Sequence, residues 1–164
     1  MYTKSVYEGK SHLIDDELND YLTALRKKIG KSGSLLVVID ACHSGDATRG
    51  NSNDKDKMMI RGTADIFQAG VRSSFVPHPL KPLDWVVISA SQSYQNNYEY
   101  KLNNEYFGSL SYALKLALNE MTGNEDFNDL FKMMLKKRED MNVVRYPQRP
   151  MIDGDRFYQT QKVF

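Results

Sequence analysis

Two short apolar runs and three amphipathic stretches organise this chain. Residues 35–40 and 85–90 are nearly continuous aliphatic runs, which predict two strands covered on both faces. Apolar residues at helical spacing predict helices over 15–29, 109–121 and 124–140. Strands and helices alternate along the chain. This order predicts an α/β fold, a three-layer α/β/α sandwich with a mostly parallel sheet.

Each predicted helix has one apolar face. The three faces consist of Leu18, Tyr21, Leu22, Leu25 and Ile29; of Leu110, Ala113, Leu114, Ala117, Leu118 and Met121; and of Phe127, Leu130, Phe131, Met134 and Leu135. Gly30 and Gly123 follow the first two helices and are expected to end them. Between the strands, residues 47–83 are rich in Gly, Ser, Asn and charge, and predict a long loop with a short helical turn near 63–68. The polar and aromatic stretch 94–104 predicts a second loop.

Composition narrows the class of protein. With 164 residues, 41% hydrophobic and 26% charged, the chain predicts one soluble globular domain over 1–164. The 22 basic and 21 acidic residues give a net charge of +1, which does not favour nucleic acid or an anionic membrane as partner. No run approaches the ~18–20 apolar residues of a membrane span, and no signal peptide is visible, so we expect a cytoplasmic protein.

The first apolar run leads directly into the block Asp-Ala-Cys-His-Ser-Gly at residues 40–45. In open α/β sheets, ligands and catalytic groups gather at the carboxyl ends of the strands. Cys42, the single cysteine, is therefore a candidate nucleophile, which would need a nearby base and an oxyanion hole of N–H donors. The alternative is a buried, inert thiol. One cysteine also excludes an internal disulfide and a Cys-rich zinc site.

This block resembles the nucleophile segment of metacaspases and related bacterial caspase-like cysteine endopeptidases. Four further segments resemble this family in the same order: residues 14–18, residues 89–91 with Gln95 and Glu99, residues 107–114 and residues 148–155. The resemblance implies a caspase-like fold. It also implies cleavage of a peptide or protein substrate after Arg or Lys.

The resemblance also assigns roles to single residues. It makes Cys42 the nucleophile, with its backbone N–H in the oxyanion hole, and puts Asp40 at the floor of the pocket for the basic substrate residue. Ala90 and Ser91 are expected to line the substrate groove, and Gln95 and Glu99 to anchor the loop after the second strand. The alternative for Asp40 is a cap of the loop that follows it.

The partner histidine of this family lies in a Ser-Gly-His-Gly segment, which these 164 residues do not contain. His12 lacks the flanking glycines, His43 belongs to the cysteine block, and His78 lies in a proline-flanked stretch. The chain therefore resembles the C-terminal two-thirds of a caspase-like domain, truncated at its N-terminus. We expect little activity from it alone.

Asp15 and Asp16 resemble a pair that contributes to a calcium site in some metacaspases. Calcium needs six or more oxygen ligands, and Arg49 stands where the family has a further aspartate. A helix-capping role for the pair is therefore favoured, and we expect no metal or other cofactor.

Two other classes of function compete with the endopeptidase. A non-catalytic caspase-like scaffold or regulatory binding module would explain the absent histidine segment. An unrelated flavodoxin-like binding domain is the third possibility, and the lack of a Gly-rich phosphate loop counts against it.

Overall fold

Two parallel strands and one antiparallel strand form the central sheet of the computed structural model, which describes residues 15–41, 83–92, 95, 97–141 and 148–164. Strand β1 (Leu36–Ile39) pairs in parallel with β2 (Val86–Ser89), and β5 (Met151–Asp153) pairs antiparallel with β2 on its other side. The two predicted strands are confirmed. The third was not predicted, because its three residues are too few to show a period.

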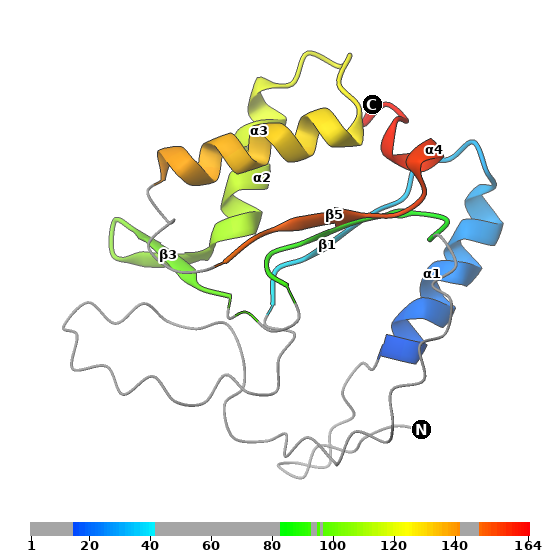
Figure 1. The fold of residues 1–164 in the computed structure, drawn as a ribbon, viewed down its shortest axis with the longest axis horizontal. Coiled ribbons are helices and arrows are strands. Elements are labelled where there is room, and N and C mark those ends of the chain that lie inside the picture. The colour runs from blue at the N-terminus through cyan, green and yellow to red at the C-terminus, as the bar shows by residue number, and fades with distance from the viewer. Residues whose placement is uncertain (1–14, 42–82, 93–94, 96, 142–147) are drawn as a thin grey trace, which may run out of the picture.

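Three helices lie where the apolar spacing predicted them. They are α1 (Asp15–Ile29), α2 (Ser109–Glu120) and α3 (Phe127–Asp140), and a short helix, α4 (Arg156–Gln159), follows β5. Helix α3 begins three residues later than predicted. Asp126 is its N-cap, and the Asp126 carboxylate accepts a hydrogen bond of 2.8 Å from the Asp129 N–H. In Figure 1, α2 and α3 lie above the sheet, and α1 lies below and to the right of it.

The core lies between the sheet and the α2–α3 pair. Its buried members are Val86, Ile88, Ala90, Leu110, Ala113, Ala117, Phe127, Leu130, Met134 and Tyr158. The predicted faces of α2 and α3 supply six of these ten residues, although Leu118 of the α2 face is exposed. The predicted face of α1 is covered much less by the described residues, since Tyr21 is 65% exposed and Leu25 42% exposed.

A hairpin replaces the second half of the loop predicted over 94–104. Strand β3 (Glu99–Leu102) pairs antiparallel with β4 (Glu105–Gly108). Asn103 and Asn104 connect them with φ angles of 51° and 66°. Positive φ at both central residues is typical of the type I′ turn that favours two-residue hairpins, and asparagine tolerates it well. The loop prediction was therefore wrong from Glu99 onward.

A glycine lets the strand β5 end close against β2. Gly154 follows β5 with φ of +125°, and a Cβ atom at this position would lie 2.3 Å from the carbonyl oxygen of Trp85. Any larger residue would have to push the two backbones apart, so the sheet needs glycine here.

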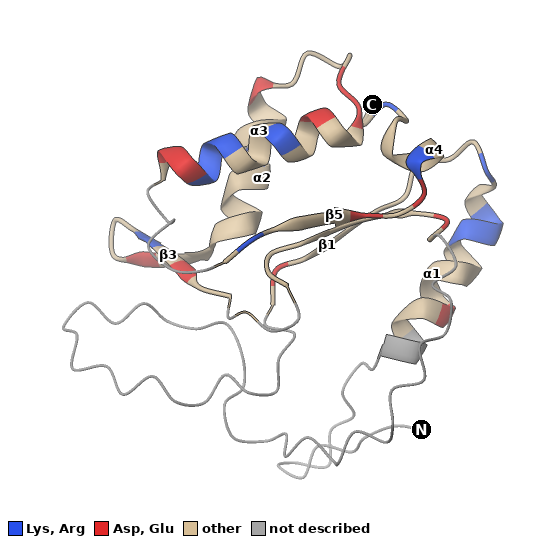
Figure 2. Ribbon diagram, in the orientation of Figure 1, with Lys and Arg blue, Asp and Glu red and all other residues tan. Residues whose placement is uncertain are grey.

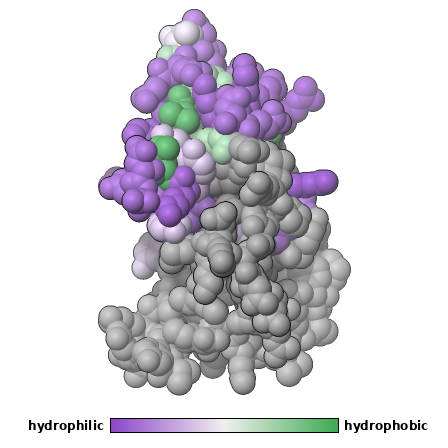
Figure 3. Space-filling view, turned by 90° about the vertical axis from the view of Figure 1, so that its left-hand side faces the viewer, coloured by the Kyte–Doolittle hydropathy of each residue, from purple (hydrophilic) through white to green (hydrophobic). Residues whose placement is uncertain are grey.

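The described surface carries charges of both signs. Acidic and basic residues are interspersed along α3 (Figure 2), and basic residues occupy the last turn of α1 and of α3, where they favour the helix dipole. On the side of the β3–β4 hairpin, the described surface is mostly hydrophilic, with small hydrophobic areas (Figure 3). None of the described helices is long and apolar enough to cross a membrane.

The mixed α/β class is thus confirmed, with small sheets in the described part of the chain.

The turn between α2 and α3 is built around the carboxylate of Glu125. It accepts hydrogen bonds from three successive backbone N–H groups, those of Thr122, Gly123 and Asn124, and from the Thr122 hydroxyl, at 2.9–3.1 Å. The Thr122 backbone and hydroxyl donors are the main cause that lowers the pKa of Glu125 from 4.5 to about 2. The turn therefore favours the ionised form of this carboxyl group.

This low pKa predicts a pH dependence of stability. Because the pKa is lower in the folded chain, the stabilisation from Glu125 is fully present above about pH 4.5 and is lost as the pH falls toward about 2. Glu125→Gln should lower the melting temperature at neutral pH, and the difference from the wild type should shrink across that window. A difference that stays constant down to the lower limit would contradict the role of the ionised carboxylate.

Candidate functional site

The ends of β1 and β2 bring two predicted site segments together. The strands run in parallel with Ile39 opposite Ser89, so Asp40 and Ala90 leave the sheet at the same edge. The Ala90 N–H donates to the Ile39 carbonyl at 2.9 Å, which continues the pairing by one step. The carboxyl edge of the sheet therefore holds Asp40 next to the segment that contains Ala90 and Ser91.

The carboxylate of Asp40 binds two segments from farther along the chain. Its Oδ1 accepts a hydrogen bond of 2.7 Å from Asn97 Nδ2. Its Oδ2 accepts two hydrogen bonds from Ser111, at 2.8 Å from the backbone N–H and at 2.7 Å from the hydroxyl. Asp40 itself is half-buried, so this cluster reaches the surface.

Asp40 caps a helix that lies 71 residues away in the sequence. Ser111 is the third residue of α2, and an N–H in the first turn of a helix has no partner within that helix. Gly108, at the N-cap, has no side chain to supply one, and the first turn of α2 contains no acidic residue. The Asp40 carboxylate takes this place and also suits the positive end of the helix dipole.

Gln148 joins the remaining segments to this cluster. Its Nε2 donates to the Ala90 carbonyl at 3.1 Å and to Asn97 Oδ1, and its Oε1 accepts from the Tyr98 N–H at 3.4 Å. Asn97 is fully buried and Gln148 is 8% exposed. Because Gln148 occupies the oxygen of the Asn97 amide, the Asn97 nitrogen is turned toward Asp40.

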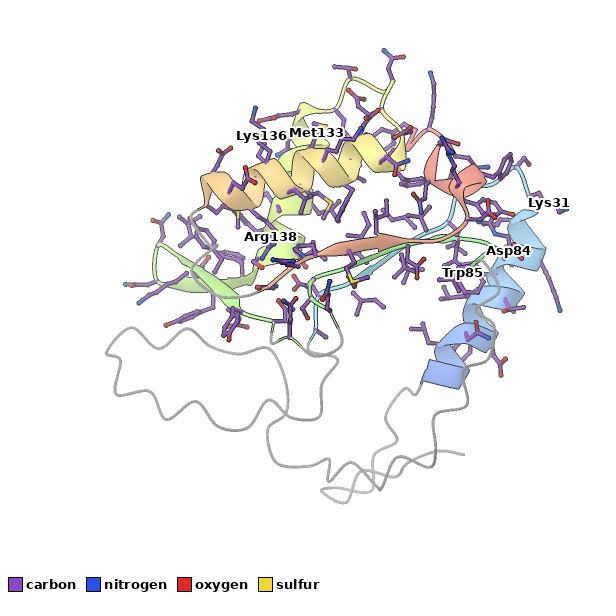
Figure 4. All side chains as sticks on the ribbon, viewed as in Figure 1. Lys31, Asp84, Trp85, Met133, Lys136 and Arg138 are labelled. Atoms are coloured by element: carbon purple, nitrogen blue, oxygen red, sulfur yellow. The ribbon has the colours of Figure 1, made fainter. Side chains whose placement is uncertain are left out.

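A buried arginine contributes charge to the same place. Arg138 lies in the last turn of α3, is 7% exposed, and extends from α3 toward the sheet, whereas Lys136 lies on the opposite side of the helix (Figure 4). Burial lowers the pKa of the Arg138 guanidinium, and the negative charge of Asp40 raises it. Arginine keeps its charge in proteins, so the positive charge of Arg138 acts on Asp40, although the described residues show no direct ion pair between the two.

The other predicted residues of this edge are packed into the structure. Gln95, which was expected to anchor the loop after β2, does so: its Oε1 accepts from the N–H groups of Arg149 at 2.9 Å and Gln92 at 3.3 Å. Ala90 is fully buried and Ser91 is 2% exposed. The Ser91 hydroxyl has no hydrogen-bond partner in the described part of the chain. The role of these two residues in lining a substrate groove stays a prediction.

Cys42 and the three histidines lie outside the described residues, as does most of the predicted loop 47–83. Ala41, the last described residue of the block, is exposed. The roles of Cys42 as nucleophile and oxyanion-hole donor therefore stay predictions.

The calcium hypothesis is not tested by the geometry. Asp15 and Asp16 open α1, but their side chains are outside the described part. Across the described residues, no group of three or more His, Cys, Asp or Glu side chains is arranged to hold a metal ion.

Three residues of the cluster were missed in the sequence, namely Asn97, Ser111 and Arg138. Ser111 offered a weak signal, since a serine in the first turn of a predicted helix has a free N–H beside its hydroxyl. Asn97 and Arg138 offered none, because only the tertiary fold brings them to Asp40.

Comparison of the chain with protein-family models gives no match, and comparison with curated proteins gives none either.

The network predicts that Gln148 stabilises the fold more than an ordinary glutamine. Gln148→Ala leaves the buried Asn97 Oδ1 and the Ala90 carbonyl without this donor, so urea unfolding should show a loss of about 1–3 kcal/mol. Gln159→Ala is the matched control, because the side chain of Gln159 donates a single hydrogen bond, to the Gly154 carbonyl. Equal losses for the two variants would contradict the central role of Gln148.

Proposed function

We propose that this chain is the cysteine-bearing part of a caspase-like cysteine endopeptidase that cleaves after basic residues. One observation carries the proposal. Four of the five segments that resemble the family meet in one cluster around Asp40. The stretch after β2 and the start of α2 bind its carboxylate through Asn97 and Ser111, and the segment of Gln148 joins through Asn97. Segments that match one family in sequence and also meet in space are better explained by a shared site than by chance.

The finer features of the family belong to the same proposal. They are the three-layer sandwich with a mostly parallel sheet, Cys42 as nucleophile, and Asp40 as the acid that receives the substrate's cation. The half-buried carboxylate of Asp40 supports the last of these, because a carboxylate at the surface edge of a sheet can reach a cationic ligand.

A non-catalytic binding module is the second candidate. The absence of a Ser-Gly-His-Gly segment from these residues favours it, as does the capping role of Asp40, which needs no substrate. The two candidates differ in whether Cys42 reacts selectively with ligands that carry a basic residue.

Selective alkylation of Cys42 tests the proposal. A peptidyl chloromethyl ketone that ends in lysine should label Cys42 faster than the same ketone that ends in norleucine, because the ammonium group binds Asp40 before the thiol reacts. The labelled residue and the rates are measured by mass spectrometry, with Cys42→Ala as the blank.

Asp40→Asn is the matched control for this experiment. It keeps the size of the side chain and removes its charge, so the preference for the lysine probe should disappear while simple iodoacetamide labelling continues. If the two ketones label the wild type equally, the binding-module candidate replaces the endopeptidase.

Turnover by the chain alone should be very low. General acid–base assistance is worth about 10²–10⁴-fold, and the family's histidine segment is absent from these residues. We therefore expect no appreciable hydrolysis of lysine or arginine amides in a fluorogenic assay. Cys42-dependent hydrolysis at an ordinary enzymatic rate would mean that His12 or His78 supplies the base.

A further inference from the structure

The carboxylate of Asp40 has little acceptor capacity left. An ionised carboxylate has two oxygens with about two acceptor positions each. Oδ2 accepts both the N–H and the hydroxyl of Ser111, and Oδ1 accepts the amide of Asn97. If only the donors in the described part of the chain are counted, one acceptor position stays open on Oδ1 and none stays open on Oδ2.

The three donors differ in how easily a ligand could displace them. Asn97 is fully buried and held by Gln148, so moving its amide would leave buried polar groups unpaired. The Ser111 N–H belongs to the first turn of α2 and cannot turn away. The Ser111 hydroxyl is on an exposed residue and can rotate into solvent. It is the donor that a ligand could displace most readily.

Arg138 weakens the electrostatic attraction that Asp40 exerts on a cationic ligand. The buried positive charge of Arg138 acts on the Asp40 carboxylate without a direct ion pair in the described residues, so a second cation meets some charge repulsion and gains less from charge alone. The fit between the donors of the ligand and the open acceptor positions then becomes more important.

Lysine and arginine differ in how many hydrogen bonds they need from a carboxylate. A lysine ammonium is a compact charge that can bind through one hydrogen bond to one oxygen. An arginine guanidinium gains most from a two-pronged contact, with one hydrogen bond to each carboxylate oxygen. Asp40 can accept a lysine ammonium without losing any of its present hydrogen bonds. A two-pronged contact with arginine requires the Ser111 hydroxyl to leave Oδ2.

We propose that the open position on Asp40 Oδ1 binds one primary ammonium group, and that the Ser111 hydroxyl makes this carboxylate select lysine over arginine. The inference rests on the proposed function, which supplies the basic substrate residue, and it deepens it by naming which base is preferred and which residue sets the preference. Ser111 is then a specificity-determining residue.

Titration with small amides tests the inference without relying on Cys42. The probes are N-acetyl-lysinamide, N-acetyl-argininamide and the neutral N-acetyl-norleucinamide, and the readout is the ¹³C NMR signal of the Asp40 carboxyl carbon in the full chain. The wild type should bind the lysine amide more tightly than the arginine amide. In Ser111→Ala the ratio of the two dissociation constants should shift toward arginine by about tenfold, which equals about 1.4 kcal/mol.

Two further variants separate specificity from structure. Ser111→Thr keeps a hydroxyl at the same position and should keep the lysine preference. Ser34→Ala removes an exposed hydroxyl that donates to the Lys162 carbonyl, far from Asp40. It should leave the two dissociation constants measured at the Asp40 carboxyl signal unchanged.

The outcomes distinguish this inference from the function on which it rests. Wild-type binding of arginine that equals or exceeds that of lysine, or an unchanged ratio in Ser111→Ala, overturns the inference and leaves the endopeptidase proposal standing. If neither basic amide perturbs Asp40 more than the norleucine amide does, the inference and the substrate role of Asp40 both fail. If the amides behave as expected but Cys42 labelling shows no basic preference, the ammonium site stands and the endopeptidase falls.

Discussion

The hydrogen bonds of one carboxylate hold the edge of this sheet together. Asp40 leaves β1 and accepts donors from Asn97 and from the first turn of α2, while Arg138 approaches from α3. A buried or half-buried carboxylate is costly unless it is well paired, and this one accepts hydrogen bonds from two segments that are distant in the sequence. The position of α2 on the sheet and the course of the chain after β2 both depend on this group.

The regular elements could be predicted because each depends on neighbours in the sequence. The aliphatic runs of β1 and β2 and the spacing of Leu110, Ala113 and Ala117 in α2 carry their own signal. The hairpin was missed because its signal is two asparagines in the left-handed region, inside a stretch whose polarity favours a loop. The candidate site was predicted only in part: Asp40 follows from its place after a strand, but its partners Asn97 and Ser111 are 57 and 71 positions away.

Asp40 combines two roles that most substitutions would remove together. Replacing it with alanine takes the cap from α2 and also takes the charge from the sheet edge, so a loss of binding in such a variant has two explanations. Ser111 separates them, because its hydroxyl contacts the carboxylate while its backbone N–H alone keeps the helix capped. Substitutions at Ser111 can therefore test ligand binding at Asp40 while the cap of α2 stays in place.

The topology has a consequence for the order of folding. Helices α2 and α3 are separated by a six-residue turn held by Glu125, so they can pair early from local contacts. Strand β1 pairs with β2 at Leu36 and Val86, 50 positions apart, and that pairing must first overcome the entropy of closing a long stretch of chain. The Asp40–Ser111 contact needs both units to be formed and docked. We therefore expect the polar cluster to form only when the two units dock, after each has made its own local contacts.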